Sequence, residues 1–461
     1  MTNQKYHLTR RRDFLKIAGM TSAAFVALPV FGMCKSEDII GGCKVIVTEE
    51  TISQWRASMT DPVWGMISGK PDLAQIMGLF PRQTGRPAFD PKLVSEKMKR
   101  IKTSPEIHTG YEYLDLSIRT GLAHIDLTFQ GNHPKYGVVE YGKVEHDGFP
   151  PTIIAAVDAL SAWGMNQRAA ELFSYWLTRF VKEDGTIDYY GPSLSEYGQL
   201  LHTATLLYER AGGDGWLKTG FAKLDKMAGS LLRMHAEAIK TDGLLSGVPE
   251  ADTRDEAGKY FHNNAWIVRG LNQWGKLCQS SRKTPSTPVQ SILASAERLK
   301  SDTLKAIHQT WPSDTTDWWL PARLGNIPRP RNMTDGNEAS YTNYRYWLEL
   351  LSSNVLPENM ANRLVIARLN GGGQFCGMTR FRDWLDDWPL ADYLYGLWNL
   401  GRKNDFLLSL FGHIAYHQCE GHLTAYEQFR FPGDPAGSWR ADYCLPSQLV
   451  AARAGRLINL K

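Results

Sequence analysis

Carboxylic acids stand in two separate polar loops of the sequence, among glycine, arginine and aromatic residues. One loop, 242–256, contains Glu250 and Asp252, and the other, 421–430, contains Glu427. A carboxyl group in an apolar or like-charged setting keeps its proton and can act as a general acid, whereas an ionised carboxylate that water can reach can act as a general base. Two such loops that met in space could carry out acid–base chemistry. A single loop glutamate, in contrast, is usually only solvated.

Aromatic and cationic residues accompany these carboxylates. Trp266 and Arg269 lie about one turn apart in an expected helix, a spacing that suits a sugar subsite. Arg254 and Arg380 could bind the carboxylate of a uronic acid through two parallel hydrogen bonds, or could pair with nearby acidic side chains. Asp387 could cap a helix or contact substrate. The residues expected to bind substrate are Tyr190, Gln199, Arg254, Asn264, Trp266, Arg269, Arg380, Asp387, Trp388 and Tyr426.

The composition of the 461 residues is that of an ordinary globular protein, with 43% hydrophobic and 22% charged residues and a formal net charge of +4. No clustered basic stripe is present, so no nucleic-acid partner is expected. The 15 Trp, 19 Tyr and 17 Phe indicate either a sugar-stacking cleft or an aromatic-rich core. The six cysteines are scattered, and neither His262 nor His422 has a second ligand at a metal-binding spacing. We therefore expect no metal and no cofactor.

Helical periodicity dominates the chain from about residue 149 onward. Apolar residues recur at steps of three and four, as in Leu194, Tyr197, Leu201, Ala204 and Tyr208. The helices expected from this pattern are 151–163, 166–181, 193–211, 215–239, 258–280, 287–309, 338–352, 357–369, 388–401, 403–418 and 443–456. Short turns between them predict antiparallel hairpins. The expected fold is all-α, an (α/α)6 toroid over 146–461 with a mixed N-terminal arm over 34–145; another all-α bundle or solenoid is the alternative.

Several loops are similar to those of six-hairpin glycosidases, across residues 145–456. The triplet Glu427-Gln428-Phe429, followed by a turn and Ala441-Asp442-Tyr443, resembles the C-terminal catalytic segment of glucoamylases. The loop 243–250 and the helix start 263–271 resemble the acid-bearing loop of the same superfamily. Segments 189–199 and 379–389 resemble bacterial relatives of unassigned or glucuronidase-like specificity that carry twin-arginine leaders. The sequence departs from glucoamylases at the acid, where Pro249-Glu250-Ala251-Asp252 replaces Trp-Glu-Glu.

This resemblance implies a glycoside hydrolase that removes a terminal sugar, which could be a uronic acid, from an oligo- or polysaccharide. Glu427 would be the general base and Glu250 or Asp252 the general acid. An inverting mechanism would follow, with the two carboxyl groups ~6.5–9.5 Å apart. Two alternatives remain open: a polysaccharide lyase or unsaturated-uronyl hydrolase on the same toroid, and a carbohydrate-binding protein without catalysis.

The first 33 residues read as an export leader. Arg11-Arg12-Asp13-Phe14-Leu15-Lys16 precedes a moderately apolar stretch that is too short to span a membrane as a helix. This pattern resembles a Tat signal, which predicts the Tat translocase as a partner and a periplasmic or secreted mature protein. Cys34 and Cys43 leave a lipid anchor open as a means of membrane tethering.

Overall fold

The computed structural model describes residues 37–40, 43–46, 107–109, 112–189, 193–212, 215–251, 256–312, 317–333, 336–375, 377–382, 384–418, 424–430 and 443–459. The predicted leader, with Cys34, lies outside the described residues. Within the described part, no helix has the length and apolarity needed to cross a membrane.

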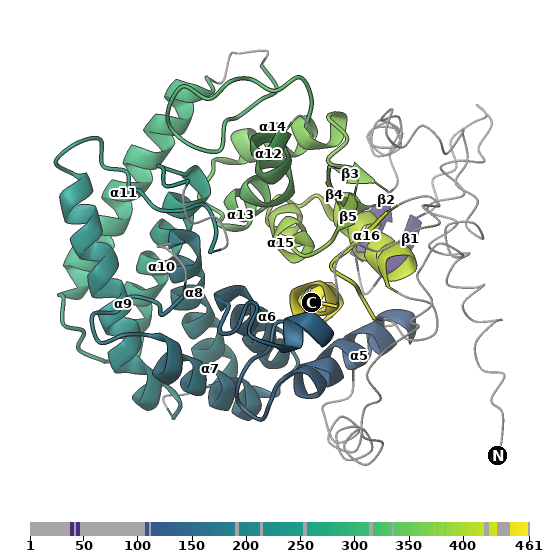
Figure 1. Cartoon of the computed structure of the whole chain (residues 1–461), viewed down its shortest axis with the longest axis horizontal. Coiled ribbons are helices and arrows are strands. Elements are labelled where there is room, and N and C mark those ends of the chain that lie inside the picture. Colours follow the sequence, from purple (N-terminus) through teal and green to yellow (C-terminus); the bar gives the residue numbers. More distant parts are fainter. Residues whose placement is uncertain are drawn as a thin grey trace.

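The core of the fold is a closed ring of inner helices. In chain order these are α6 (Pro150–Ala162), α8 (Leu194–Ala211), α10 (Phe261–Ser280), α13 (Trp347–Ser352), α15 (Leu390–Asn399) and α18 (Val450–Ala454). Each one packs on the next, and α18 packs back on α6. Figure 1 looks onto this ring. The inner helices are buried almost all round, as expected for helices enclosed on both sides.

Outer helices cover the inner ring, and each is amphipathic or buried on one face. They are α5 (Glu112–Thr128), α7 (Asn166–Phe180), α9 (Leu217–Ala238), α11 (Val289–Thr310), α14 (Glu358–Asn370) and α16 (Lys403–Gly412). In α7, for example, only Ala169, Leu172, Phe173, Trp176, Leu177 and Phe180 are buried. Inner and outer helices therefore alternate along the chain, which confirms the predicted (α/α)6 toroid.

Helix α5 falls inside the segment that the sequence analysis describes as a mixed arm. It packs on α18, α17 (Leu445–Gln448) and α6, which makes it an outer helix of the ring. Elsewhere in the described part of that arm, β1 (Glu37–Ile40) and β2 (Cys43–Ile46) form an antiparallel pair.

One inner-ring segment and one outer-ring segment depart from simple α-helical geometry. The predicted helix 338–352 is α12 (Gly336–Tyr341), a π-helical turn η2 (Thr342–Tyr346) and α13. The predicted helix 403–418 likewise ends in a π-helical turn, η3 (His413–His417). Such turns widen the helix locally and are frequent at functional sites. Both carry residues of the clusters described below.

A small antiparallel sheet lies at one end of the ring. Its strands are β3 (Gln374–Phe375), β4 (Met378–Phe381), β5 (Trp384–Asp386) and β6 (Gln428–Arg430), paired in that order. Pairing of Asp386 with Gln428 fixes the register between β5 and β6. The sheet therefore joins the segment before α15 to the segment that contains Glu427.

Close contact between α8 and α10 depends on two glycines. A Cβ atom on Gly198 would lie 2.1 Å from the carbonyl oxygen of Trp266, and one on Gly270 would lie 2.6 Å from the Gly198 backbone. The helices can approach this closely only because neither residue has a side chain. Gln199, Trp266 and Arg269 are placed by this contact.

Candidate active site

Glu427 is held by two tyrosines from a distant part of the chain. The Tyr136 hydroxyl donates to Oε1 at 2.6 Å, and the Tyr141 hydroxyl donates to Oε2 at 2.6 Å. Glu427 itself stays partly exposed. Burial, and after it the charge of Glu427, raises the pKa of Tyr141 far above its usual value, so the phenol keeps its proton and remains a donor. A carboxylate that accepts two such bonds is fixed in position and stabilised in its ionised form.

Asp386 lies next to Glu427 across the β5–β6 pair. Its Oδ2 accepts from Gln428 Nε2 at 2.7 Å, and its Oδ1 accepts from the backbone N–H of Trp388 at 3.0 Å. Burial, and then the charge of Glu427, raises the pKa of Asp386 well above its usual value. This carboxyl is therefore a neighbour of Glu427 that favours its neutral form. The next residue, Asp387, was predicted from the sequence to cap a helix or to contact substrate.

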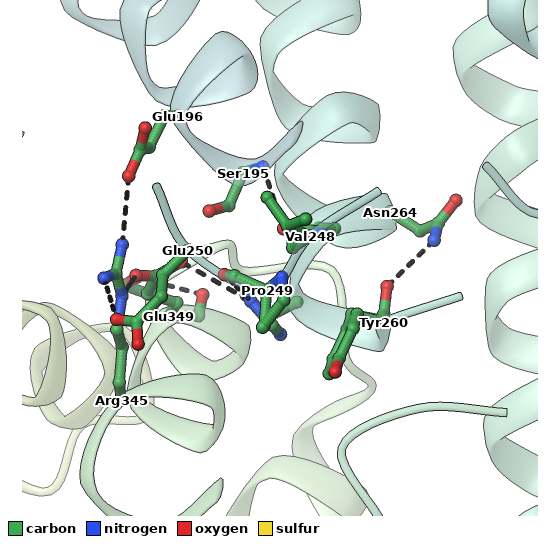
Figure 2. A network of polar contacts seen from close by, with 12 residues as sticks. Ser195, Glu196, Val248, Pro249, Glu250, Tyr260, Asn264, Arg345 and Glu349 are labelled. Carbon is green, nitrogen blue, oxygen red and sulfur yellow. Dashed lines mark hydrogen bonds and ion pairs between the residues drawn. The ribbon is translucent and has the colours of Figure 1, made fainter. Parts of the chain in front are cut away.

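A second group of carboxylates surrounds Arg345 on η2 (Figure 2). Its Nη1 contacts Glu250, its Nη2 contacts Glu196 at 3.1 Å and its Nε contacts Glu349 at 2.6 Å. All four side chains are at most 5% exposed. Burial lowers the pKa of Arg345, but the three carboxylates raise it well above its usual value, so the guanidinium stays charged. The formal charge of this buried cluster, one cation against three anions, is −2.

Aromatic side chains connect the two carboxylate groups. Trp388 stacks on Arg345, with the guanidinium carbon 4.6 Å from the ring centre. Trp388 also belongs to a buried apolar cluster, whose members are Tyr136, Phe149, Ala251, Tyr344, Phe381, Trp388 and Cys444. Ala251 follows Glu250 in the chain, and Tyr136 binds Glu427, so this cluster spans from one carboxylate to the other.

Tyr344 lies among the carboxyl groups of both clusters. Burial raises the pKa of Tyr344 first, and the charges of Asp386, Glu427 and Glu250 raise it further. Its hydroxyl also bonds to Asp386. The charges of Glu250 and Glu427, which lie in separate loops of the sequence, thus both act on one phenol.

Three of the predicted substrate-binding residues line a separate cavity on the inner face of the ring. Gln199, Trp266 and Arg269 face a space of about 190 Å³, together with Asp158, His202 and Arg453 among others. Arg269 stacks on Trp266 at 5.1 Å and donates to the carbonyl oxygen of Ser352. Gln199 is about one helical turn beyond Glu196 along α8. The cavity therefore lies further toward the C-terminal end of α8 than the Arg345 cluster does.

Other residues predicted to bind substrate are buried or form hydrogen bonds within the protein. The amide of Asn264 accepts from Leu245 N and donates to the carbonyl oxygens of Leu245 and Tyr260. Arg380 is fully buried on β4, and Tyr426 is largely buried beside Glu427. The contacts of Asn264 do not favour its predicted role in binding substrate. Tyr190, Asp252 and Arg254 lie outside the described residues, so their roles stay predictions.

Asp387 belongs to a third, fully buried cluster. Its Oδ2 lies 2.8 Å from Nδ1 of His413 and 3.2 Å from Nδ1 of His417, both on η3. Burial raises the pKa of Asp387 to about 6, although His417 opposes this shift. His413 and His417 were not predicted as ligands, although their spacing of four residues on an expected helix was a signal available in the sequence.

Solved structures of glycosidases share this fold. A wild-type glycosidase superposes with a TM-score of 0.54 at 13% identity, over 81% of this chain and 100% of that chain. A rhamnosidase from Klebsiella oxytoca with rhamnose bound gives 0.51 at 12% identity, over 77% of this chain and 65% of that one. A metal-independent α-mannosidase of Streptococcus pneumoniae, in complex with α-1,6-mannobiose, gives 0.51 at 11% identity, over 80% and 98%. No protein-family model and no curated protein matches the sequence.

At these identities the likeness establishes the fold. The chain has an (α/α)6 toroid fold, which these solved glycosidases share and which the sequence predicted.

Proposed function

We propose that this protein is a glycoside hydrolase in which Glu427 activates the attacking water. The observation that carries the proposal is the pair of tyrosine hydroxyls on Glu427, because they hold a partly exposed carboxylate in place at the edge of an aromatic cluster and favour its ionised form. A general base needs this combination of fixed position, negative charge and access to water. The aromatic rings beside it suit the apolar faces of a sugar.

Glu250 supplies the proton in this proposal. A buried cluster with a formal charge of −2 is costly, because one guanidinium cannot compensate three desolvated carboxylates. The cluster is therefore expected to hold a proton. Glu250 is the least buried of its carboxylates and adjoins the aromatic cluster through Ala251, so it is the member best placed to pass that proton to a leaving oxygen. Asp252 remains the alternative acid.

The substrate class follows from the surroundings of these carboxylates and from the fold. A terminal sugar of an oligo- or polysaccharide would stack on the aromatic cluster, and glycosidases of the same fold bind glucose, rhamnose and a mannobiose. A uronic acid is the charged sugar that the loop arginines would favour. The leader supports export through the Tat translocase, with action in the periplasm or outside the cell.

The test is sugar release from a panel of neutral and uronate-containing oligosaccharides. Wild type should release a monosaccharide, Glu427→Gln should lose at least about a thousandfold in kcat, and the exposed-loop control Glu183→Gln should match wild type. Proton NMR of the first product would show the opposite anomer if the enzyme inverts. Retained turnover in Glu427→Gln would overturn the proposal.

Two other outcomes would identify the alternatives. Products that absorb in the ultraviolet as unsaturated uronates would indicate a lyase. Binding of glycans without turnover by the wild type would indicate a carbohydrate-binding protein.

A further inference from the structure

Asp387, His413 and His417 form a compact cluster that the proposed hydrolysis does not use. Their side chains have no exposed surface, and one potential ligand atom from each lies within 4.8 Å of the others. The two imidazole rings stack with centres 5.2 Å apart. On a π-helical turn, residues four apart project to nearly the same side, so both rings face the one carboxylate.

The hydrogen bond of His417 fixes which of its nitrogens carries a proton. Its Nε2 lies 2.6 Å from the carbonyl oxygen of Tyr426, which can only accept, so Nε2 must donate. In the neutral ring, Nδ1 is then an acceptor. This nitrogen faces Oδ2 of Asp387, another acceptor, at 3.2 Å. Two lone pairs directed at each other repel, whereas a cation between them would bind both.

His417 and Asp387 also have partners outside the cluster that match those of metal ligands. Histidines that bind a metal usually donate their second N–H to a carbonyl or carboxylate, as His417 does to Tyr426. Carboxylate ligands are usually held by further hydrogen bonds, and Asp387 Oδ1 accepts from the backbone N–H of Thr379 at 2.7 Å. Two imidazoles with one carboxylate suit zinc and similar transition ions, whereas calcium and magnesium prefer oxygen ligands alone.

We infer that Asp387, His413 and His417 bind a divalent transition-metal ion of the zinc type. The ion joins the end of β5 to η3 and, through the Tyr426 carbonyl, to the residue before Glu427. It contacts no substrate. Its role is to hold Asp386, which directly precedes the ligand Asp387, and Glu427, which directly follows Tyr426, in fixed relative positions. This inference does not rest on the proposed hydrolysis.

The test uses the full chain, stripped with a chelator and titrated with Co²⁺. Wild type should bind about one equivalent and show visible d–d absorption without a thiolate-to-cobalt band, since the ligands are nitrogen and oxygen. Zn²⁺ should displace the Co²⁺ and raise the Tm of the stripped protein by a few degrees. Elemental analysis of protein from unsupplemented medium would show which ion is acquired.

The matched variants are His413→Gln and His417→Gln, with His235→Gln as a control for a histidine outside the cluster. The first two should weaken Co²⁺ binding at least tenfold and abolish the Tm response, while the control retains both. If wild type binds no stoichiometric Co²⁺ or Zn²⁺, the cluster is only a hydrogen-bonded ion pair and the inference is wrong. The wild-type titration decides this even if a variant fails to fold, and none of these readings depends on sugar turnover.

Discussion

Tyr141 donates a hydrogen bond to Oε2 of Glu427 at 2.6 Å, although 286 residues separate them in the chain. Tyr136 binds the other carboxylate oxygen, so both oxygens have a fixed donor. The segment before α6 thus positions a residue from the C-terminal loop. This arrangement explains how a partly exposed side chain can keep one orientation.

Removing either donor should reduce activity without unfolding the protein. A hydrogen bond to a charged group contributes roughly 1.5–3 kcal/mol, so Tyr136→Phe or Tyr141→Phe should lower kcat by roughly 10- to 100-fold. KM should change less than kcat, because the phenols contact the carboxylate of Glu427 and their loss therefore affects the chemical step more than substrate binding. Steady-state kinetics would measure both, with Tyr175→Phe, whose partner is His133, as the control. Equal losses in all three variants would argue against a specific role.

Arg345 should be essential for stability. Replacing it with Met leaves the carboxylates of Glu196, Glu250 and Glu349 buried without a cation, which should cost about 3–5 kcal/mol of unfolding free energy. Urea denaturation would measure this loss. The exposed pair Arg298–Asp302 provides the control, since Arg298→Met should cost at most about 0.5 kcal/mol. Similar midpoints for the two variants would contradict the charge balance described for this cluster.

Asp158 should make the protein sensitive to acid. Burial raises its pKa, but the guanidinium groups of Arg210 and Arg453 lower it to about 2, below the usual 3.8. The folded state therefore binds this proton less readily than the unfolded state. The stabilisation, about 2 kcal/mol, is complete above pH ~4 and is lost as the pH falls through ~2.

Asp158→Asn should remove this contribution and flatten the pH dependence of unfolding between pH ~4 and ~2. Denaturation at several pH values would show it, with the exposed Glu237→Gln as the control. An unchanged acid limb in Asp158→Asn would mean that other carboxylates dominate the acid sensitivity.

Export directed by the leader should depend on its arginine pair, Arg11 and Arg12. Replacing Arg11 and Arg12 by Lys in a fusion to a folded reporter should keep the reporter in the cytoplasm, because Tat receptors read the pair itself and not only its charge. Arg10→Lys should have little effect. Fractionation of a bacterial host would measure the distribution. Export of the double variant would contradict the Tat assignment.

Much of the fold could be predicted from periodicity. The apolar stripe Leu194, Tyr197, Leu201 and Ala204 is buried in α8, because a repeat of three and four residues places these side chains on one face of a helix. Helix α5 was harder to predict. Its packing partners include α17 and α18, more than 300 residues away, and a local pattern contains no information about them.

Within the candidate site, residue type and loop context indicated Glu250 and Glu427. Their partners were not predicted. Tyr136, Tyr141 and Arg345 stand in segments with no catalytic signature, and nothing in the sequence links them to the glutamates. Their importance comes from burial and proximity, which appear only when the ring closes.

The sequence by itself determined the alternation of inner and outer helices and the residue types of the loops, because both depend on local spacing and composition. Only the tertiary structure decided the charge state and orientation of each carboxylate. Arg345 contacts Glu250, two phenols hold Glu427, and two imidazoles from η3 meet Asp387. Electrostatic interactions of this strength require short distances in a desolvated interior, and the closed toroid creates that interior.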